Sequence, residues 1–216
     1  MHESVLSPKQ VAALNKGFQE QFGILPEKFF SAPGRTEIGG NHTDHQRGKV
    51  LAAAVNLDSL AAVRRTGTKR IRVLSQGYPM IEIQLGDLSF RAEEVNTTAA
   101  LVRGIAARFT EMGHPVGGFD AYIESTVLSG SGLSSSAAFE VLIGTVINHL
   151  FCNGAVSQPQ IAMIGQFAEN TYFGKPCGLM DQTASAVGGL VTIDFAKKDQ
   201  PDIRSVDFDF SACGYG

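Results

Sequence analysis

The sequence predicts an α+β fold, in which helices and strands are mixed without the regular alternation of a parallel α/β sheet. Two observations carry this prediction. Apolar residues recur at helical spacing in some segments, and they alternate with polar residues in others. The chain has 216 residues, of which 44% are hydrophobic and 18% are charged. That composition is typical of a globular protein with a sizeable core and excludes a wholly disordered chain.

Four segments have the apolar spacing of helices. The first is expected to begin at Ser7, a favoured N-terminal cap, and to end at Gly23, a favoured C-terminal cap. The others are expected over residues 98–112, 137–151 and 158–172. The segment 137–151 is apolar on nearly every face, which predicts a buried helix.

Strand patterns are expected over residues 27–32, 49–64, 71–73, 81–85, 119–127 and 189–195. The third and fourth of these flank a glycine-containing turn and predict a hairpin. The fifth alternates apolar and polar residues, which is typical of a strand with one buried face. Residues 33–48 and 174–182 lack periodicity and are expected to be loops. The polar tail, residues 197–216, is expected to end without a terminating element.

Charge and cysteine content exclude several classes of protein. The net charge is −3, from 18 basic and 21 acidic side chains, and this balance argues against a nucleic-acid-binding protein. No segment approaches the roughly 18–20 consecutive apolar residues of a membrane span, and the first residues lack a signal-peptide core. The three cysteines, Cys152, Cys177 and Cys213, lack metal-ligand spacing and fit a reducing compartment. We expect a cytoplasmic protein with small-molecule partners and no membrane partner; the sequence predicts no oligomeric state.

Residues 130–136 form a glycine- and serine-rich turn between a predicted strand and the predicted buried helix. Free backbone N–H groups and the positive end of the helix dipole at such a place can hold phosphate. The Walker, dinucleotide and hydrolase motifs are not matched; the dinucleotide pattern, for example, is broken at Ser135. An ordinary glycine turn capped by serine explains the same residues about equally well.

The polar segment 35–45 offers a second candidate site. Arg35 can bind a phosphate or carboxylate with two donors. His42, Asp44 and His45 include metal-ligating types, but the segment offers no fourth ligand nearby. Hydrogen bonding to the hydroxyls of a sugar explains the mixture of asparagine, histidine and aspartate better. The alternative is a solvated surface loop.

Two carboxylates form the third candidate. Glu169 lies late in a predicted helix, and Asp181 follows a turn rich in proline and glycine. A carboxylate beside an apolar core can act as a general base or as a cation ligand. A helix-end charge and a turn-forming aspartate are the alternative interpretations.

Taken together, the segments 32–44, 129–138 and 169–182 resemble the GHMP small-molecule kinases, most closely the galactokinase family. They are similar to its signature loop, its phosphate-binding loop and its catalytic aspartate segment, in that order. The resemblance implies a mixed sheet with helices, like ribosomal S5 domain 2, over residues 1–195. It also implies the beginning of a truncated C-terminal α+β domain over residues 196–216. We therefore expect this chain to be the N-terminal half of a longer kinase, and we expect this half to be inactive alone.

The resemblance implies phosphorylation of galactose at its anomeric hydroxyl to galactose 1-phosphate, with ATP and Mg²⁺. It implies that Asp181 is the catalytic carboxylate and that Arg35 lies beside it. The residues implied to bind the sugar are Asn41, His42, Asp44 and Gly178. Those implied to bind ATP are Gly130, Ser131, Gly132, Leu133, Ser134, Ser135 and Ser136. Those implied to hold Mg²⁺ are Ser136 and Glu169.

The chain departs from the family pattern at several positions. Asn41 stands where the family usually has glutamate, and His45 where it has tyrosine. The first turns of the predicted helix, Thr98–Arg103, lack the aromatic side chain that the family often places near adenine. These departures keep a kinase for a modified hexose open as an alternative. A sensor that binds galactose and ATP, and a metal hydrolase built on the histidines, are further alternatives; the ligand count disfavours the hydrolase.

Overall fold

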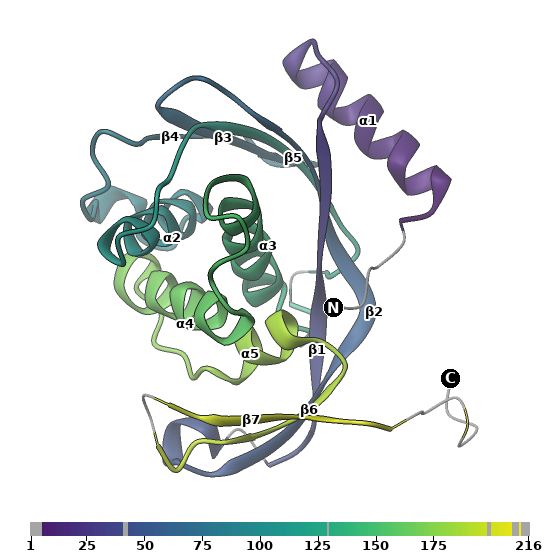
Figure 1. The fold of residues 1–216 in the computed structure, drawn as a ribbon, viewed down its shortest axis with the longest axis vertical. Coiled ribbons are helices and arrows are strands. Elements are labelled where there is room, and N and C mark those ends of the chain that lie inside the picture. The colour runs from purple at the N-terminus through teal and green to yellow at the C-terminus, as the bar shows by residue number, and fades with distance from the viewer. Residues whose placement is uncertain (1–5, 41–42, 129, 198–199, 209–211, 213–216) are drawn as a thin grey trace.

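The computed structural model describes residues 6–40, 43–128, 130–197, 200–208 and 212. Seven strands form one mixed sheet in the order β4-β3-β5-β2-β6-β7, and β1 also pairs with β2 (Figure 1). Their bounds are β1 Lys28–Gly39, β2 Lys49–Arg65, β3 Arg70–Ser75, β4 Ile81–Gln84, β5 Phe119–Ser125, β6 Leu190–Asp194 and β7 Asp202–Val206. Only the β3–β5 pair is parallel among these strands. The predicted α+β class is confirmed.

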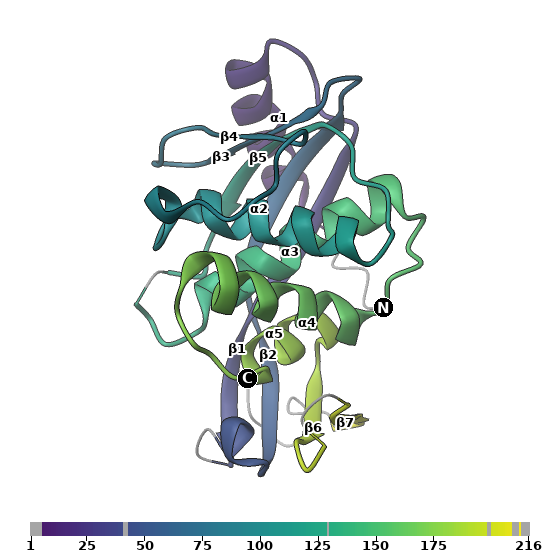
Figure 2. The ribbon, with the colours of Figure 1, turned by 90° about the vertical axis from the view of Figure 1, so that its left-hand side faces the viewer.

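The helices form two unequal layers on the sheet. Their bounds are α1 Pro8–Phe22, α2 Thr98–Glu111, α3 Ser135–Phe151, α4 Gln158–Ala168 and α5 Met180–Val187. Helices α2 to α5 cover one face and α1 lies on the other side (Figures 1 and 2). None of the helices in the described ranges is long and apolar enough to cross a membrane.

Helix α1 has the predicted ends. The Ser7 hydroxyl accepts a hydrogen bond from the Gln10 backbone, and the Gln10 side chain accepts one from the Ser7 backbone. Gly23 closes the helix with φ 72°, in the left-handed region that favours glycine. The predictions for α2 and for the buried helix α3 are confirmed as well.

The expectation that residue 33 begins a loop was wrong. Strand β1 continues to Gly39 and pairs with β2, which is one strand of 17 residues. The pairing register shifts between Pro33 and Arg35 and again between Glu37 and Gly39. These irregularities accommodate a proline, which cannot donate to the ladder, and they hide the two-residue period in the sequence.

Strand β5 is buried on both faces rather than on one. Its residue Ile123 belongs to the main core under α2 and α3, as the alternation predicts. The neighbouring Tyr122 packs with Leu14 and Phe18 of α1 on the opposite face. The sequence pattern of β5 does not show this second layer, because its polar residues are covered by a distant part of the chain.

Three further elements differ from the predictions. The predicted helix over residues 158–172 is α4 followed by η3, a π-helix over Glu169–Phe173. Helix α5 begins within the segment 174–182, where a loop was expected, and strand β7 lies in the polar tail, to which no element was assigned. Helix α5 is short and mostly small or polar, so it lacks a readable apolar period; packing of Met180 and Ala184 on the β2–β6 core stabilises it. Strand β7 pairs with β6; the domain boundary at residue 195 stays a prediction.

Candidate functional site

The candidate site is centred on a two-pronged ion pair between β1 and α5. The Arg35 Nε donates to Asp181 Oδ1 and its Nη2 donates to Asp181 Oδ2, both at 2.7 Å. The Arg35 side chain is 9% exposed and that of Asp181 is 33% exposed. Two parallel charge-assisted hydrogen bonds fix the plane of the carboxylate. Asp181 lies in the first turn of α5, where the sequence predicted a loop. Because its side chain is one-third exposed, one side of the carboxylate is open to solvent.

Arg35 also contacts the glycine-rich loop. Its Nη1 donates to the Gly132 carbonyl at 2.7 Å, and its backbone N–H donates to the Leu133 carbonyl at 3.0 Å. A Cβ atom on Gly34 would lie 3.0 Å from that same Leu133 oxygen. Glycine at position 34 thus allows β1 to approach the loop closely.

Ser134 connects the loop directly to Asp181. Its hydroxyl donates a short hydrogen bond to Asp181 Oδ2. Its backbone has φ 56° and ψ 60°, the left-handed conformation that costs a non-glycine residue about 1–2 kcal/mol. The sequence predicted only a phosphate-binding role for Ser134. The contact with Asp181 had no signal in the sequence because the two residues meet only in the folded chain.

The remaining loop residues lead into α3. Gly130 and Gly132 have positive φ angles of 77° and 79°, and the Ser131 hydroxyl closes the turn on the Leu128 carbonyl at 2.7 Å. Ser135 is the first residue of α3, so the free N–H groups of this helix begin at the loop. The positive end of the helix dipole therefore lies where the sequence predicted phosphate binding.

A cavity of about 490 Å³ opens beside the start of α3. Ser135 and Ser136 line it on one side, and Tyr78, from the β3–β4 turn, lines it on another. Phe173, at the end of η3, contributes a second aromatic surface. Aromatic and apolar walls with a few hydroxyls and amides are typical of a site for a small organic ligand.

Glu169 lies in a buried polar cluster between α3, η3 and α5. Its Oε2 accepts a hydrogen bond from Gln182 Nε2 at 2.9 Å, and the same nitrogen donates to Glu140 Oε2 at 2.9 Å. Glu140 and Gln182 are fully buried. Burial raises the pKa of Glu140 well above its usual value, and the nearby Glu169 carboxylate raises it further. Burial also raises the pKa of the Cys177 thiol, which lies against the cluster.

The outward oxygen of Glu169 has a different partner. Its Oε1 lies 3.3 Å from Lys175 Nζ, in a segment between η3 and α5. The Lys175 side chain is 61% exposed, whereas that of Glu169 is 4% exposed. The sequence identified Glu169 but missed its neighbours Glu140, Lys175 and Gln182. A glutamate on the mostly apolar predicted helix 137–151 was the available signal for Glu140.

The residues expected to bind the sugar are described only in part. Asn41 and His42 lie outside the described residues, so their predicted roles stay predictions. Asp44 lies in the short 3₁₀-helix η1, Thr43–Gln46, which joins β1 to β2. Gly178 is half-buried and lies immediately before α5, close in sequence to Asp181.

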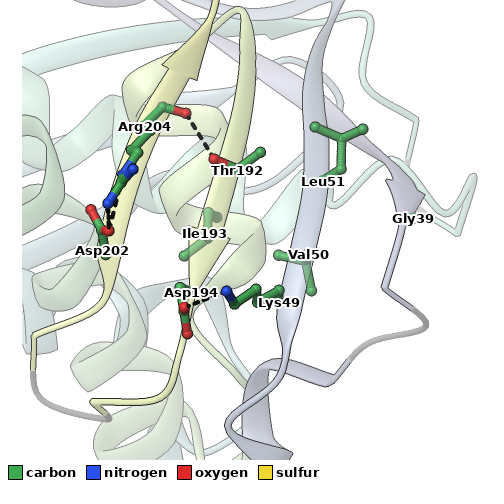
Figure 3. Close-up of a pocket in the computed structure, with 9 residues that line it drawn as sticks. All are labelled: Gly39, Lys49, Val50, Leu51, Thr192, Ile193, Asp194, Asp202 and Arg204. Carbon is green, nitrogen blue, oxygen red and sulfur yellow. Dashed lines mark hydrogen bonds and ion pairs between the residues drawn. The ribbon is translucent and has the colours of Figure 1, made fainter.

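A second cavity, of about 440 Å³, lies at the far end of the sheet between β2, β6 and β7 (Figure 3). Figure 3 shows two exposed ion pairs there, Lys49 with Asp194 and Arg204 with Asp202. Its described lining residues do not include those of the Arg35–Asp181 site.

Comparison with known proteins assigns the class. Residues 100–189 match the N-terminal domain of the GHMP kinases, and residues 16–65 match the galactose-binding signature of galactokinase. The mevalonate kinase of Methanococcus jannaschii shares the fold, with a TM-score of 0.68 and 16% identity over 86% of this chain and 57% of that one. Over residues 100–189, the chain contains the N-terminal domain of the GHMP kinases.

Within that family, the similarity is to galactokinases. The galactokinase of Streptomyces coelicolor is 37% identical over 202 residues, which make up 91% of this chain and 51% of that relative. The crystal structure of Lactococcus lactis galactokinase complexed with galactose matches with a TM-score of 0.82 and 29% identity, over 92% of this chain and 52% of that one. The chain thus spans about half the length of the relatives it matches.

Proposed function

We propose that the chain forms the N-terminal half of a sugar kinase that transfers the γ-phosphoryl group of ATP to the anomeric hydroxyl of galactose. The observation that carries this proposal is the position of Asp181. Arg35 and Ser134 hold its carboxylate against a glycine-rich loop that opens helix α3. A fixed proton acceptor beside an anion-binding helix N-terminus is what phosphoryl transfer to a hydroxyl requires.

In the proposed mechanism, Asp181 accepts the proton of the sugar hydroxyl as that oxygen attacks the γ-phosphorus. Arg35 fixes the orientation of the carboxylate, so little reorganisation is needed when the hydroxyl approaches. The partial exposure of Asp181 leaves room for a substrate on its open side. Backbone N–H groups at the start of α3 stabilise the charge on the transferred group.

The cavity beside α3 is the proposed place for the base of ATP. Its lining residues Ser135 and Ser136 lie where the phosphate chain would begin, and Tyr78 and Phe173 offer aromatic surfaces to a base. These two side chains come from outside the helix in which the family often places its aromatic residue. The departure seen in the sequence therefore does not remove aromatic surface from the cavity.

Ser136 and Glu169 are the proposed ligands of Mg²⁺. A hydroxyl and a carboxylate are hard oxygen donors of the kind that Mg²⁺ prefers. The ammonium of Lys175 lies 3.3 Å from Glu169 Oε1, so this oxygen has space for a cation beside it. When bound, the metal would neutralise charge on the phosphates.

The proposed sugar contacts are Asn41, His42, Asp44 and Gly178. The first three precede β2 in the sequence, and Gly178 precedes α5. Support comes from the galactose-binding signature, which covers the first three of them. The proposed setting is the cytoplasm, with ATP and the sugar as small-molecule partners.

The test is sugar-dependent release of ADP. An enzyme would carry this chain as its N-terminal half, joined to the C-terminal half of the Streptomyces coelicolor relative. We expect ADP release with galactose and much less with glucose, mannose or 6-deoxygalactose. If a folded enzyme of this kind binds ATP and galactose but releases no ADP, the proposal is wrong and a sensor is favoured. Preference for a modified hexose would instead correct the substrate.

A further inference from the structure

The two oxygens of the Glu169 carboxylate have different surroundings. Oε2 points to Gln182, whose Nε2 lies 2.9 Å away and is fully buried. Oε1 points to the ammonium of Lys175, 3.3 Å away, on a side chain that is 61% exposed. Oε2 therefore accepts a hydrogen bond from a buried amide, whereas Oε1 contacts the ammonium of an exposed lysine, which another cation can replace.

The inner contact is buried and shared between two carboxyl groups. Gln182 Nε2 also donates to Glu140 Oε2 at 2.9 Å, so the amide is tied to two carboxyl groups at once. Close packing supports this arrangement, because a Cβ atom on Gly165 of α4 would lie 3.1 Å from both Glu140 Cβ and Oε2. Rotation of the Glu169 carboxylate would break its contact with Gln182 in a buried environment, where an unpaired polar group is destabilising because no water replaces the lost partner.

The outer contact is replaceable. The ammonium of an exposed lysine is only weakly held in an ion pair, because water competes for it. A buried carboxylate nevertheless favours a cation beside it, since it has lost most of its own solvent. A divalent cation with its waters satisfies the same oxygen with twice the charge.

We propose that Lys175 is the resident counter-ion of Glu169 and that a divalent cation must displace its ammonium in order to bind. Lys175 then sets the metal concentration at which the site fills, by competing with the metal for Glu169 Oε1. The role of Glu169 as the metal ligand is taken from the proposed function; the competition by Lys175 is additional to it.

The test is a titration of the 216-residue chain with Mn²⁺. Binding is measured from the electron paramagnetic resonance signal of the Mn²⁺ that remains free. We expect Lys175→Met to lower the dissociation constant of Mn²⁺ by roughly three- to tenfold, from the weight of one competing ion pair. Lys175→Arg keeps the charge and should bind Mn²⁺ like the unmodified chain. Lys49→Met is the matched control, because Lys49 forms an exposed ion pair with Asp194, at 3.1 Å, away from the site.

The outcomes separate this inference from the proposed function. Equal Mn²⁺ affinity in the unmodified chain and Lys175→Met, with loss of binding in Glu169→Gln, would overturn competition by Lys175 and leave Glu169 as a ligand. Binding that does not change in Glu169→Gln would overturn both. Absence of Mn²⁺ binding by a folded Lys175→Met chain would also overturn the inference, since the competing charge is then gone. Far-UV circular dichroism would check that each variant folds.

Discussion

Arg35 and Asp181 form two parallel hydrogen bonds of 2.7 Å between the first strand of the sheet and the start of its fifth helix. A third donor of the same guanidinium bonds the Gly132 carbonyl at 2.7 Å. One side chain thus joins all three segments that the sequence identified as candidate sites. Through Arg35, the position of the Asp181 carboxylate depends on the conformation of the glycine-rich loop, and the reverse also holds.

Replacement of Asp181 by asparagine is expected to nearly abolish turnover. Asparagine keeps the shape of the side chain but loses the basic oxygen, and loss of a proton acceptor costs on the order of 10²–10⁴-fold in rate. The rate of ADP release would be measured in the enzyme that joins this chain to the C-terminal half of the Streptomyces coelicolor relative. Calorimetry would check that ATP still binds. More than about a tenth of the original rate would mean that Asp181 is not the base.

The Arg35–Asp181 pair should show strong energetic coupling. In a double-mutant cycle with Arg35→Met and Asp181→Asn, we expect a coupling energy of about 1–3 kcal/mol in urea unfolding. The reason is that each single change leaves the partner, Arg35 at 9% or Asp181 at 33% side-chain exposure, without the charge-assisted hydrogen bonds that join the pair. Additive effects of the two substitutions would contradict this expectation. The exposed pair Arg108–Glu111 is a suitable control, with a coupling of about 0.5 kcal/mol or less.

Two substitutions of Ser134 separate its backbone strain from its hydrogen bond. Both Ser134→Ala and Ser134→Gly remove the bond to Asp181, but only glycine adopts the left-handed conformation without strain. After allowance for the larger entropy of unfolded glycine, the glycine variant should be more stable than the alanine variant by about 1 kcal/mol. Urea unfolding of the two variants would measure it. Equal stabilities would show that position 134 relaxes out of the left-handed region.

The stability of the chain should depend on pH through Glu140. Its pKa is raised above the usual 4.5 by burial and by Glu169. Such a carboxyl contributes its full stability below about pH 4.5, and this contribution is lost as the pH rises through the folded-state pKa. Glu140→Gln cannot ionise, so its unfolding midpoint should exceed that of the unmodified chain by a margin that grows with pH. The exposed Glu93 is the control, since Glu93→Gln should follow the unmodified chain at every pH.

Tyr78 should contribute to binding of the base of ATP. Its side chain lines the cavity beside α3 and is 63% exposed. Loss of an aromatic contact is worth about 0.5–1.5 kcal/mol, so Tyr78→Ala should weaken ATP binding by roughly two- to tenfold. Binding of inorganic triphosphate should not change. Phe90→Ala is the control, because Phe90 is 50% exposed and packs on Tyr172 instead.

Tyr78→Trp provides an independent measurement for the same prediction. The chain contains no tryptophan, so this substitution introduces a single fluorophore. ATP should change its emission and inorganic triphosphate should not. An emission that responds equally to both ligands would indicate that Tyr78 reports on the phosphates rather than on the base.

Several elements could be predicted because their signals are local. Ser7 and Gly23 mark the ends of α1 by side-chain and backbone preferences that act within a few residues. The hairpin of β3 and β4 follows from alternation on both sides of Gly77. Other elements depend on distant contacts: β1 runs on through Pro33 because β2 pairs with it, and α5 forms because its apolar side packs on the sheet.

The sequence by itself determined the chemical types at the site, the order of the three segments and their resemblance to one kinase family. It could do so because a glycine-rich turn, an arginine and a carboxylate each have chemistry that depends little on the rest of the chain. Only the tertiary structure decided which groups meet: Ser134 with Asp181, Gln182 with Glu140, and Lys175 with Glu169. Such contacts depend on how helices pack across the sheet, and packing is a property of the whole fold rather than of any segment.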